Sequence, residues 1–204
     1  DLALSGPNAK VRDYHHAVGE EWGVLTTVNG DGARLTVQFH YIGSDKVIVE
    51  SGTELISASV GKCDGGVDQG NRGGQVYFVL LRRCPELSVD LCVEEGEENE
   101  RERCNPRLIR LARLPLPSAP ASLSETWRAW VLFPPGRTDM VVLLFSAGGL
   151  LYTCCPATHH VQARGSVFPE KQAGAVLDVS WDAVSGDLMV LEAERLAVFR
   201  VSNL

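Results

Sequence analysis

The chain has 204 residues, 45% of them hydrophobic, which is enough to bury the core of one large β domain or two small ones. Its formal net charge is −7, from 26 acidic and 19 basic residues. A nucleic-acid surface needs clustered lysine and arginine to displace counterions, so we expect no direct nucleic-acid binding. No apolar run reaches the roughly 18 residues of a transmembrane helix, so we expect no membrane insertion.

The first clear pattern along the chain predicts a hairpin. Residues 22–29 and 33–42 are apolar enough for strands, and Leu35, Val37, Phe39 and Tyr41 alternate with polar residues. That period of two is typical of a half-buried strand, and the Gly- and Asp-rich turn between the two segments favours antiparallel pairing. Residues 46–50 form a third predicted strand.

The middle of the chain alternates predicted strands with polar connections. Residues 61–74 hold six glycines and few apolar residues, which predicts a flexible loop. Two strands follow, at 75–82 and 87–93. Residues 107–114 fit a helix or a strand by periodicity, but a proline-rich connection at 115–124 would end a helix early, so we expect a strand.

A run of charged residues at 94–106 lies between the predicted strands at 87–93 and 107–114. Its composition predicts a second flexible, solvated loop. The alternative is an acidic docking strip for a basic partner, and its residues would be Glu97, Glu98 and Glu100.

The last third of the chain gives the clearest strand pattern. Six apolar segments are separated by turn residues, at 128–133, 139–145, 149–154, 175–181, 187–192 and 195–201. They fall into two triplets. Trp130 matches Val176 at an offset of 46, whereas Val141 matches Leu188 and Leu150 matches Ala197 at an offset of 47. A period of this size is typical of propeller arrays, in which each small sheet stacks on its neighbours.

The segments Val179–Asp182, Ser185–Leu188 and Leu196–Val201 resemble the strand-turn-strand-turn-strand of a WD40-type propeller blade. The Gly-His pair and the closing Trp-Asp of that family are absent from their expected places, so the resemblance concerns architecture. It implies a rigid platform for protein binding inside an assembly.

The sequence therefore predicts an all-β fold of antiparallel blade-like sheets, a partial or compact β-propeller. Residues 1–204 would form a single β-rich domain or a propeller fragment. At about 47 residues per blade the chain makes about four blades, so we expect more chain or another subunit to complete the ring. The chain opens on Asp1, and we expect a piece of a longer protein. A β-sandwich with long loops is the alternative, although the number of predicted strands favours blades.

No motif predicts a catalytic residue, a cofactor or a metal site. Cys154, Cys155, His159 and His160 lie close together in sequence, but adjacent strand residues point to opposite faces and zinc ligands are usually spaced more widely. His15 and His16 are expected at the surface. A Ser/His/Asp triad assembled from distant positions stays open, and with it a hydrolase function.

Six cysteines match no small secreted framework, and four of them lie in or beside apolar runs. We expect reduced thiols and an intracellular protein, cytoplasmic or nuclear, rather than a secreted or lumenal one. The alternative disulfides are Cys63–Cys84 and Cys92–Cys104.

Together these features predict a non-catalytic protein–protein interaction scaffold in a multiprotein assembly. Trp127 and Trp130 are candidate partner anchors, since exposed tryptophan is enriched at binding hot spots. The alternative function is an extracellular or lumenal β-sandwich recognition module that binds carbohydrate.

Overall fold

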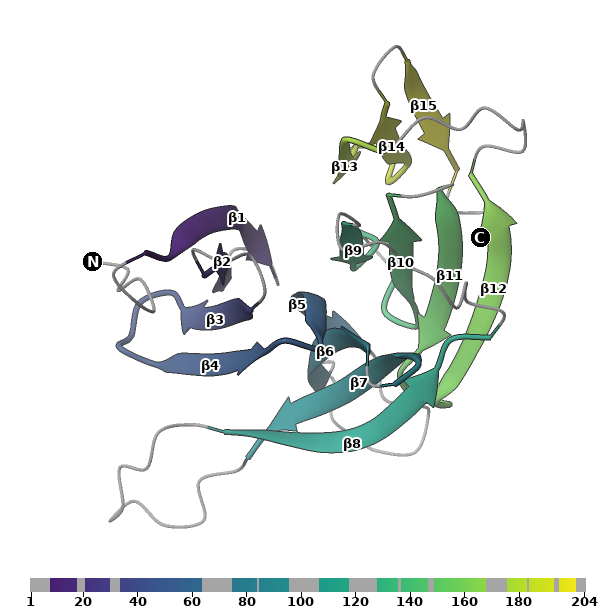
Figure 1. Ribbon diagram of the computed structural model, residues 1–204. Coiled ribbons are helices and arrows are strands. Elements are labelled where there is room, and N and C mark those ends of the chain that lie inside the picture. Colours follow the sequence, from purple (N-terminus) through teal and green to yellow (C-terminus); the bar gives the residue numbers. More distant parts are fainter. Residues whose placement is uncertain are drawn as a thin grey trace. The chain divides into compact units, whose positions relative to one another are not determined.

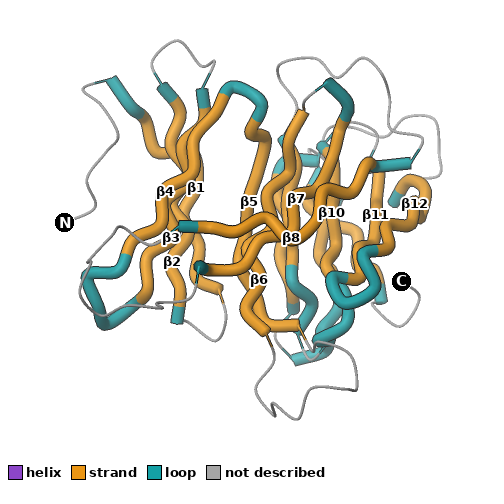
Figure 2. The backbone as a smooth tube through the Cα atoms, turned by 90° about the horizontal axis from the view of Figure 1, so that it is seen from below, coloured by secondary structure: helices purple, strands orange, loops and turns teal. Residues whose placement is uncertain are grey.

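Every regular element that the structure describes is a β-strand (Figure 2). The computed structural model describes residues 8–17, 21–29, 34–63, 75–83, 85–95, 107–117, 128–135, 137–146, 149–167, 176–182, 184–192 and 195–200. In these residues the strands form four antiparallel sheets, which we call sheets A to D in chain order. The chain is therefore all-β with four blade-like sheets of propeller type, which confirms the predicted fold class. The β-sandwich alternative is wrong, because a sandwich has two sheets.

The chain divides into two compact units. The first, Asp1–Lys62 with Val76–Arg113, carries sheet A and most of sheet B. The second, Cys63–Gln75 with Leu114–Leu204, carries sheets C and D. In the described part of both units no helix is long and apolar enough to cross a membrane.

Sheet A is a meander whose strand order follows the chain (Figure 1). Its strands are β1 (Lys10–Ala17), β2 (Trp22–Val28), β3 (Leu35–Tyr41) and β4 (Val47–Gly52). Strands β2 and β3 pair antiparallel from Trp22 opposite Tyr41 to Val28 opposite Leu35, which confirms the predicted hairpin. The Asn29 N–H closes it by donating to the Arg34 carbonyl at 3.1 Å.

Sheet B repeats the meander, in the order β5-β6-β7-β8. Its strands are β5 (Leu55–Cys63), β6 (Gln75–Arg83), β7 (Leu87–Glu94) and β8 (Leu108–Pro115). Both faces of β6 are buried: Phe78 and Leu80 face the core shared with sheet A, and Val79 and Leu81 on the opposite face are 0% exposed. Burial on two faces is what a propeller blade requires.

The core of the first unit lies between sheets A and B. Val24, Val37 and Phe39 of sheet A pack there against Phe78 and Leu80 of sheet B. The Phe78 ring meets the Trp22 and Phe39 rings edge to face, with both centroid distances at 5.1 Å. Aromatic pairs in this geometry add to the stabilisation that their buried area provides.

Sheets C and D form the second unit and share its core. Sheet C contains β9 (Ala129–Leu132), β10 (Val141–Phe145), β11 (Leu150–Cys155) and β12 (His160–Ser166). The described part of sheet D contains β13 (Asp178–Trp181), β14 (Leu188–Leu191) and β15 (Leu196–Phe199). Val142 and Leu144 of sheet C pack against Leu188 and Val190 of sheet D.

The predicted repeat matches this topology in the second and third strands, whereas Val176, the predicted match of Trp130, lies before β13. Val141 opens β10 and Leu188 opens β14, while Leu150 opens β11 and Ala197 lies in β15. The sequence offset therefore relates the second and third strands of sheet C to those of sheet D.

Three strands were not predicted: β1, β5 and β12. The loop predicted at 61–74 is wrong over its first three residues, which form the end of β5, and residues 64–74 lie outside the described part. The strand predicted at 107–114 is confirmed as β8. Of the other predicted connections, residues 96–106 and 118–124 also lie outside the described part.

Candidate functional site

Of the predicted partner-binding residues, Trp130 alone lies in the described part of the chain. Trp130 lies in β9, where its side chain is half-buried and packs against the core between sheets C and D. A role of Trp130 in binding a partner stays a prediction. Trp127, Glu97, Glu98 and Glu100 lie outside the described residues.

The cysteine–histidine cluster follows the hairpin from β11 to β12. Cys154 is 1% exposed, and burial raises the pKa of its thiol to about 12. Cys155 lies at the end of β11 opposite His160 of β12, and His159 takes a left-handed turn conformation with φ of 53°. Among the residues that the structure describes, no group of three or more His, Cys, Asp or Glu could hold a metal ion.

His15 occupies a site that sequence reasoning missed. Its Nε2 lies 3.2 Å from the Ser59 Oγ of β5, and its Nδ1 lies 3.6 Å from the Asp13 carboxylate. The neighbouring His15 ring lowers the pKa of Asp13. His15 is thus not simply a surface residue, because it links β1 of sheet A to β5 of sheet B.

Asp13, His15 and Ser59 follow the order of groups in an acyl-transfer relay, in which histidine takes the serine proton and the carboxylate orients the ring. Two observations weigh against that chemistry. The Nδ1–Oδ2 distance of 3.6 Å exceeds a hydrogen bond. Ser59 is 4% exposed, which leaves little access for a carbonyl carbon to reach its hydroxyl. The contact is better explained as a link between two strands.

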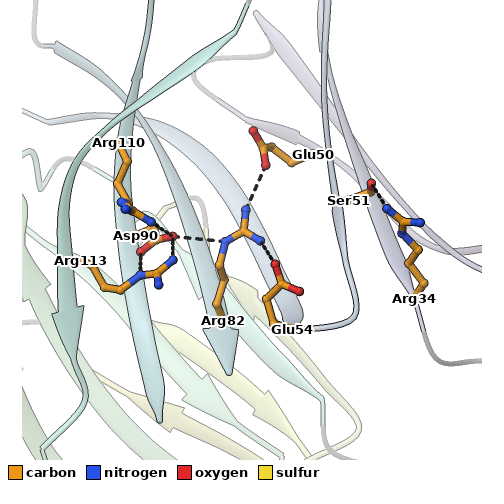
Figure 3. A network of polar contacts seen from close by, with 8 residues as sticks. All are labelled: Arg34, Glu50, Ser51, Glu54, Arg82, Asp90, Arg110 and Arg113. Atoms are coloured by element: carbon orange, nitrogen blue, oxygen red, sulfur yellow. Dashed lines mark hydrogen bonds and ion pairs between the residues drawn. The ribbon is translucent and has the colours of Figure 1, made fainter. Parts of the chain in front are cut away.

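The densest polar cluster in the first unit surrounds Arg82 of β6 (Figure 3). Its guanidinium donates to Glu50 and Glu54, both at 3.0 Å, and its Nε lies 3.2 Å from Asp90. The Arg82 side chain is only 10% exposed. Since burying an unpaired charge is costly, these carboxylates are what allow the guanidinium to remain buried.

Asp90 of β7 extends the cluster toward β8. Arg113 binds its carboxylate through two nitrogens at 2.6 and 2.8 Å, and Arg110 lies 3.7 Å away. Arg82, Arg110 and Arg113 thus face the carboxylates of Glu50, Glu54 and Asp90, so three positive charges balance three negative ones.

The Arg82–Asp90 cluster connects β4 of sheet A to β6, β7 and β8 of sheet B. Its positive and negative charges balance, so the cluster links the two sheets and does not require a ligand, although the buried Arg82 Nε makes no hydrogen bond. The sequence signal for it was present: Arg82 and Asp90 are charged residues inside apolar strand segments.

No protein-family model matches the sequence, and no curated protein matches it.

Proposed function

We propose that the chain is a non-catalytic scaffold for protein–protein interaction, a subunit of a multiprotein assembly. The observation that carries the proposal is the exposure of three large aliphatic side chains on one face of sheet D. Leu191, Leu196 and Val198 are 43%, 60% and 58% exposed. Apolar side chains gathered on a sheet surface mark contact sites for other proteins.

The propeller-type sheets support the same function. Stacked sheets form a rigid platform, and the WD40-like pattern at Val179–Asp182 and Ser185–Leu188 is consistent with a blade of such a platform. We propose that further blades, from more chain or from another subunit, complete the propeller. Trp127 and the acidic residues Glu97, Glu98 and Glu100 are additional proposed contacts.

An intracellular location, cytoplasmic or nuclear, belongs to this proposal. Cys92, Cys154 and Cys155 are free thiols, and a free Cys92 argues against the Cys92–Cys104 disulfide. Buried reduced thiols are typical of proteins in reducing compartments. The recognition-module alternative loses its support, because it required the sandwich fold.

The test is purification of the tagged chain from cells that express it at low level, followed by native mass spectrometry. A scaffold subunit is expected to retain a partner in fixed stoichiometry, whereas the tag alone retains none. A monodisperse, partner-free chain that stays folded at nanomolar concentration would contradict the proposal.

A further inference from the structure

The outer face of sheet D is apolar and exposed. Along β14, Leu188 and Val190 are 0% exposed and face the core shared with sheet C. The alternating residue Leu191 points to the opposite face, where its cross-strand partner in β15 is Leu196. Leu191 and Leu196 are 43% and 60% exposed, and Val198 on the same face is 58% exposed.

The sequence repeat relates this face of sheet D to the face of sheet C that contacts sheet D. Val142, Leu144 and Leu151 of sheet C form its contact with sheet D, and they are 0%, 0% and 4% exposed. The strand pairing places these three positions at Met189, Leu191 and Leu196, because Leu151 pairs with Leu144 as Leu196 pairs with Leu191. At these positions sheet D therefore repeats the apolar surface with which sheet C contacts its following neighbour.

We propose that a blade-type antiparallel sheet of a different protein stacks on this outer face of sheet D. The proposal rests on the scaffold function proposed above and names its contact surface. A terminal repeat that meets only water requires a polar outer face. Sheet D instead keeps methionine and leucine at these three stacking positions, so the face is built to be covered.

The chemistry of the partner surface follows from Asp178. Asp178 lies opposite Leu191 in the sheet, and therefore on the same outer face. Asp178 pairs with Leu191 as Trp130 pairs with Leu144 in sheet C, so Asp178 occupies the position of Trp130, which packs against the core of sheets C and D. A carboxylate at an otherwise aliphatic stacking surface selects a partner that presents lysine or arginine opposite it. The expected partner sheet is therefore aliphatic in its centre and basic at one edge.

The first test compares charge insertions on and off this face. Leu196→Glu and Val198→Glu are expected to reduce recovery of the partner with the tagged chain at least tenfold. Val184→Glu is the matched control, since Val184 is 95% exposed in the turn between β13 and β14 and is expected to leave recovery unchanged. Circular dichroism and the melting temperature check that all three variants fold.

The second test is photo-crosslinking, with p-benzoylphenylalanine replacing Leu196, Val198 or, as control, Val184. Adducts from the first two positions to alternate residues of one strand in another polypeptide would support the proposal. Adducts to a second copy of this chain, adducts within the same polypeptide, or no adduct would overturn it. If the partner still binds the Leu196→Glu and Val198→Glu variants, the proposed contact surface is wrong, but the scaffold function is not contradicted. A wild-type chain that purifies without any partner contradicts the scaffold function itself.

Discussion

Asp90 keeps a charged side chain inside the first unit because arginines surround it. Its side chain is 3% exposed, and Arg82, Arg110 and Arg113 all lie within 3.7 Å of it. A buried ion pair adds little net stability compared with apolar residues, but removing one partner leaves the other charge uncompensated. The largely buried Arg82 guanidinium would keep Glu50 and Glu54 and lose one of its three carboxylates.

Asp90→Ala is therefore expected to lower the free energy of unfolding by about 1–3 kcal/mol, the cost of leaving buried polar groups without a partner. Asp139→Ala is the matched control, because Asp139 pairs with Arg137 at a side-chain exposure of 63%. Exposed pairs contribute about 0–1 kcal/mol. Urea unfolding of both variants measures the difference, and equal losses would show that the Arg82–Asp90 cluster is not buried as described.

The buried thiols give a second prediction at the scale of single residues. Burial raises the pKa of Cys92 and of Cys154 to about 12, from an ordinary value of 9.0. The thiolate is the reactive form, so both residues are expected to resist iodoacetamide at pH 8 in the native protein and to react in urea. Half-buried Cys155 is the internal comparison and is expected to react faster. Mass spectrometry of the alkylated peptides measures the labelling rate of each cysteine. If Cys154 in the native protein were labelled as fast as in the unfolded chain, the predicted protection would be wrong.

The same pKa shifts have a consequence for stability. Because the unfolded thiols ionise at lower pH than the folded ones, their contribution is complete below pH 9 and declines as pH rises toward 12. The free energy of unfolding is therefore expected to fall over that alkaline range, and Cys92→Ala should make the fall shallower.

Among the strands, those that sequence reasoning missed share a position. β1, β5 and β12 each lie at an edge of their sheet. β1 and β12 bury little surface, so their sequences alternate less clearly, whereas β5 is mostly buried. β12 is mostly exposed and polar, and β5 contains small residues such as Ala58 and Ser59. The central strands β2, β3, β6, β7, β10, β11 and β14 were all predicted.

The polar sites were harder to predict than the strands, for a physical reason. Alternation along one strand shows which residues are buried, but not which residue of another strand lies opposite. Glu50 and Arg82 are 32 positions apart, and His15 and Ser59 are 44 apart. Their pairing depends on how sheet A stacks on sheet B, which no local pattern encodes.

Stacking of sheet A on sheet B depends most on Phe78, which contacts the Trp22 and Phe39 rings and is 0% exposed. Phe78→Ala is expected to cost about 3–5 kcal/mol through lost burial and the cavity left behind. Phe78→Leu keeps most of the volume and is expected to cost less. Urea unfolding followed by tryptophan fluorescence measures both. Leu111→Ala, at an exposed position of β8, is the control with an expected change within about 0.5 kcal/mol.

At the scale of the whole molecule, each of the two units has its own core. The core around Phe78 draws its residues from sheets A and B, and the core around Leu144 from sheets C and D. Stability need not be uniform across such a chain, because local and sub-global opening reflects the contacts of each part.

A substitution in one core is accordingly expected to loosen its own unit first. Leu144 is 0% exposed, and Leu144→Ala should cost about 2–5 kcal/mol, or roughly 25-fold or more in the population of opened states. Hydrogen exchange measured by mass spectrometry should then accelerate in β10, β11 and β14 by that factor and change less in β2, β3 and β6. Phe78→Ala serves as the reciprocal control, with the larger acceleration in β2, β3 and β6. If both variants accelerate exchange equally in all six strands, the chain opens as one cooperative body. The division into two units would then describe its contacts and not its energetics.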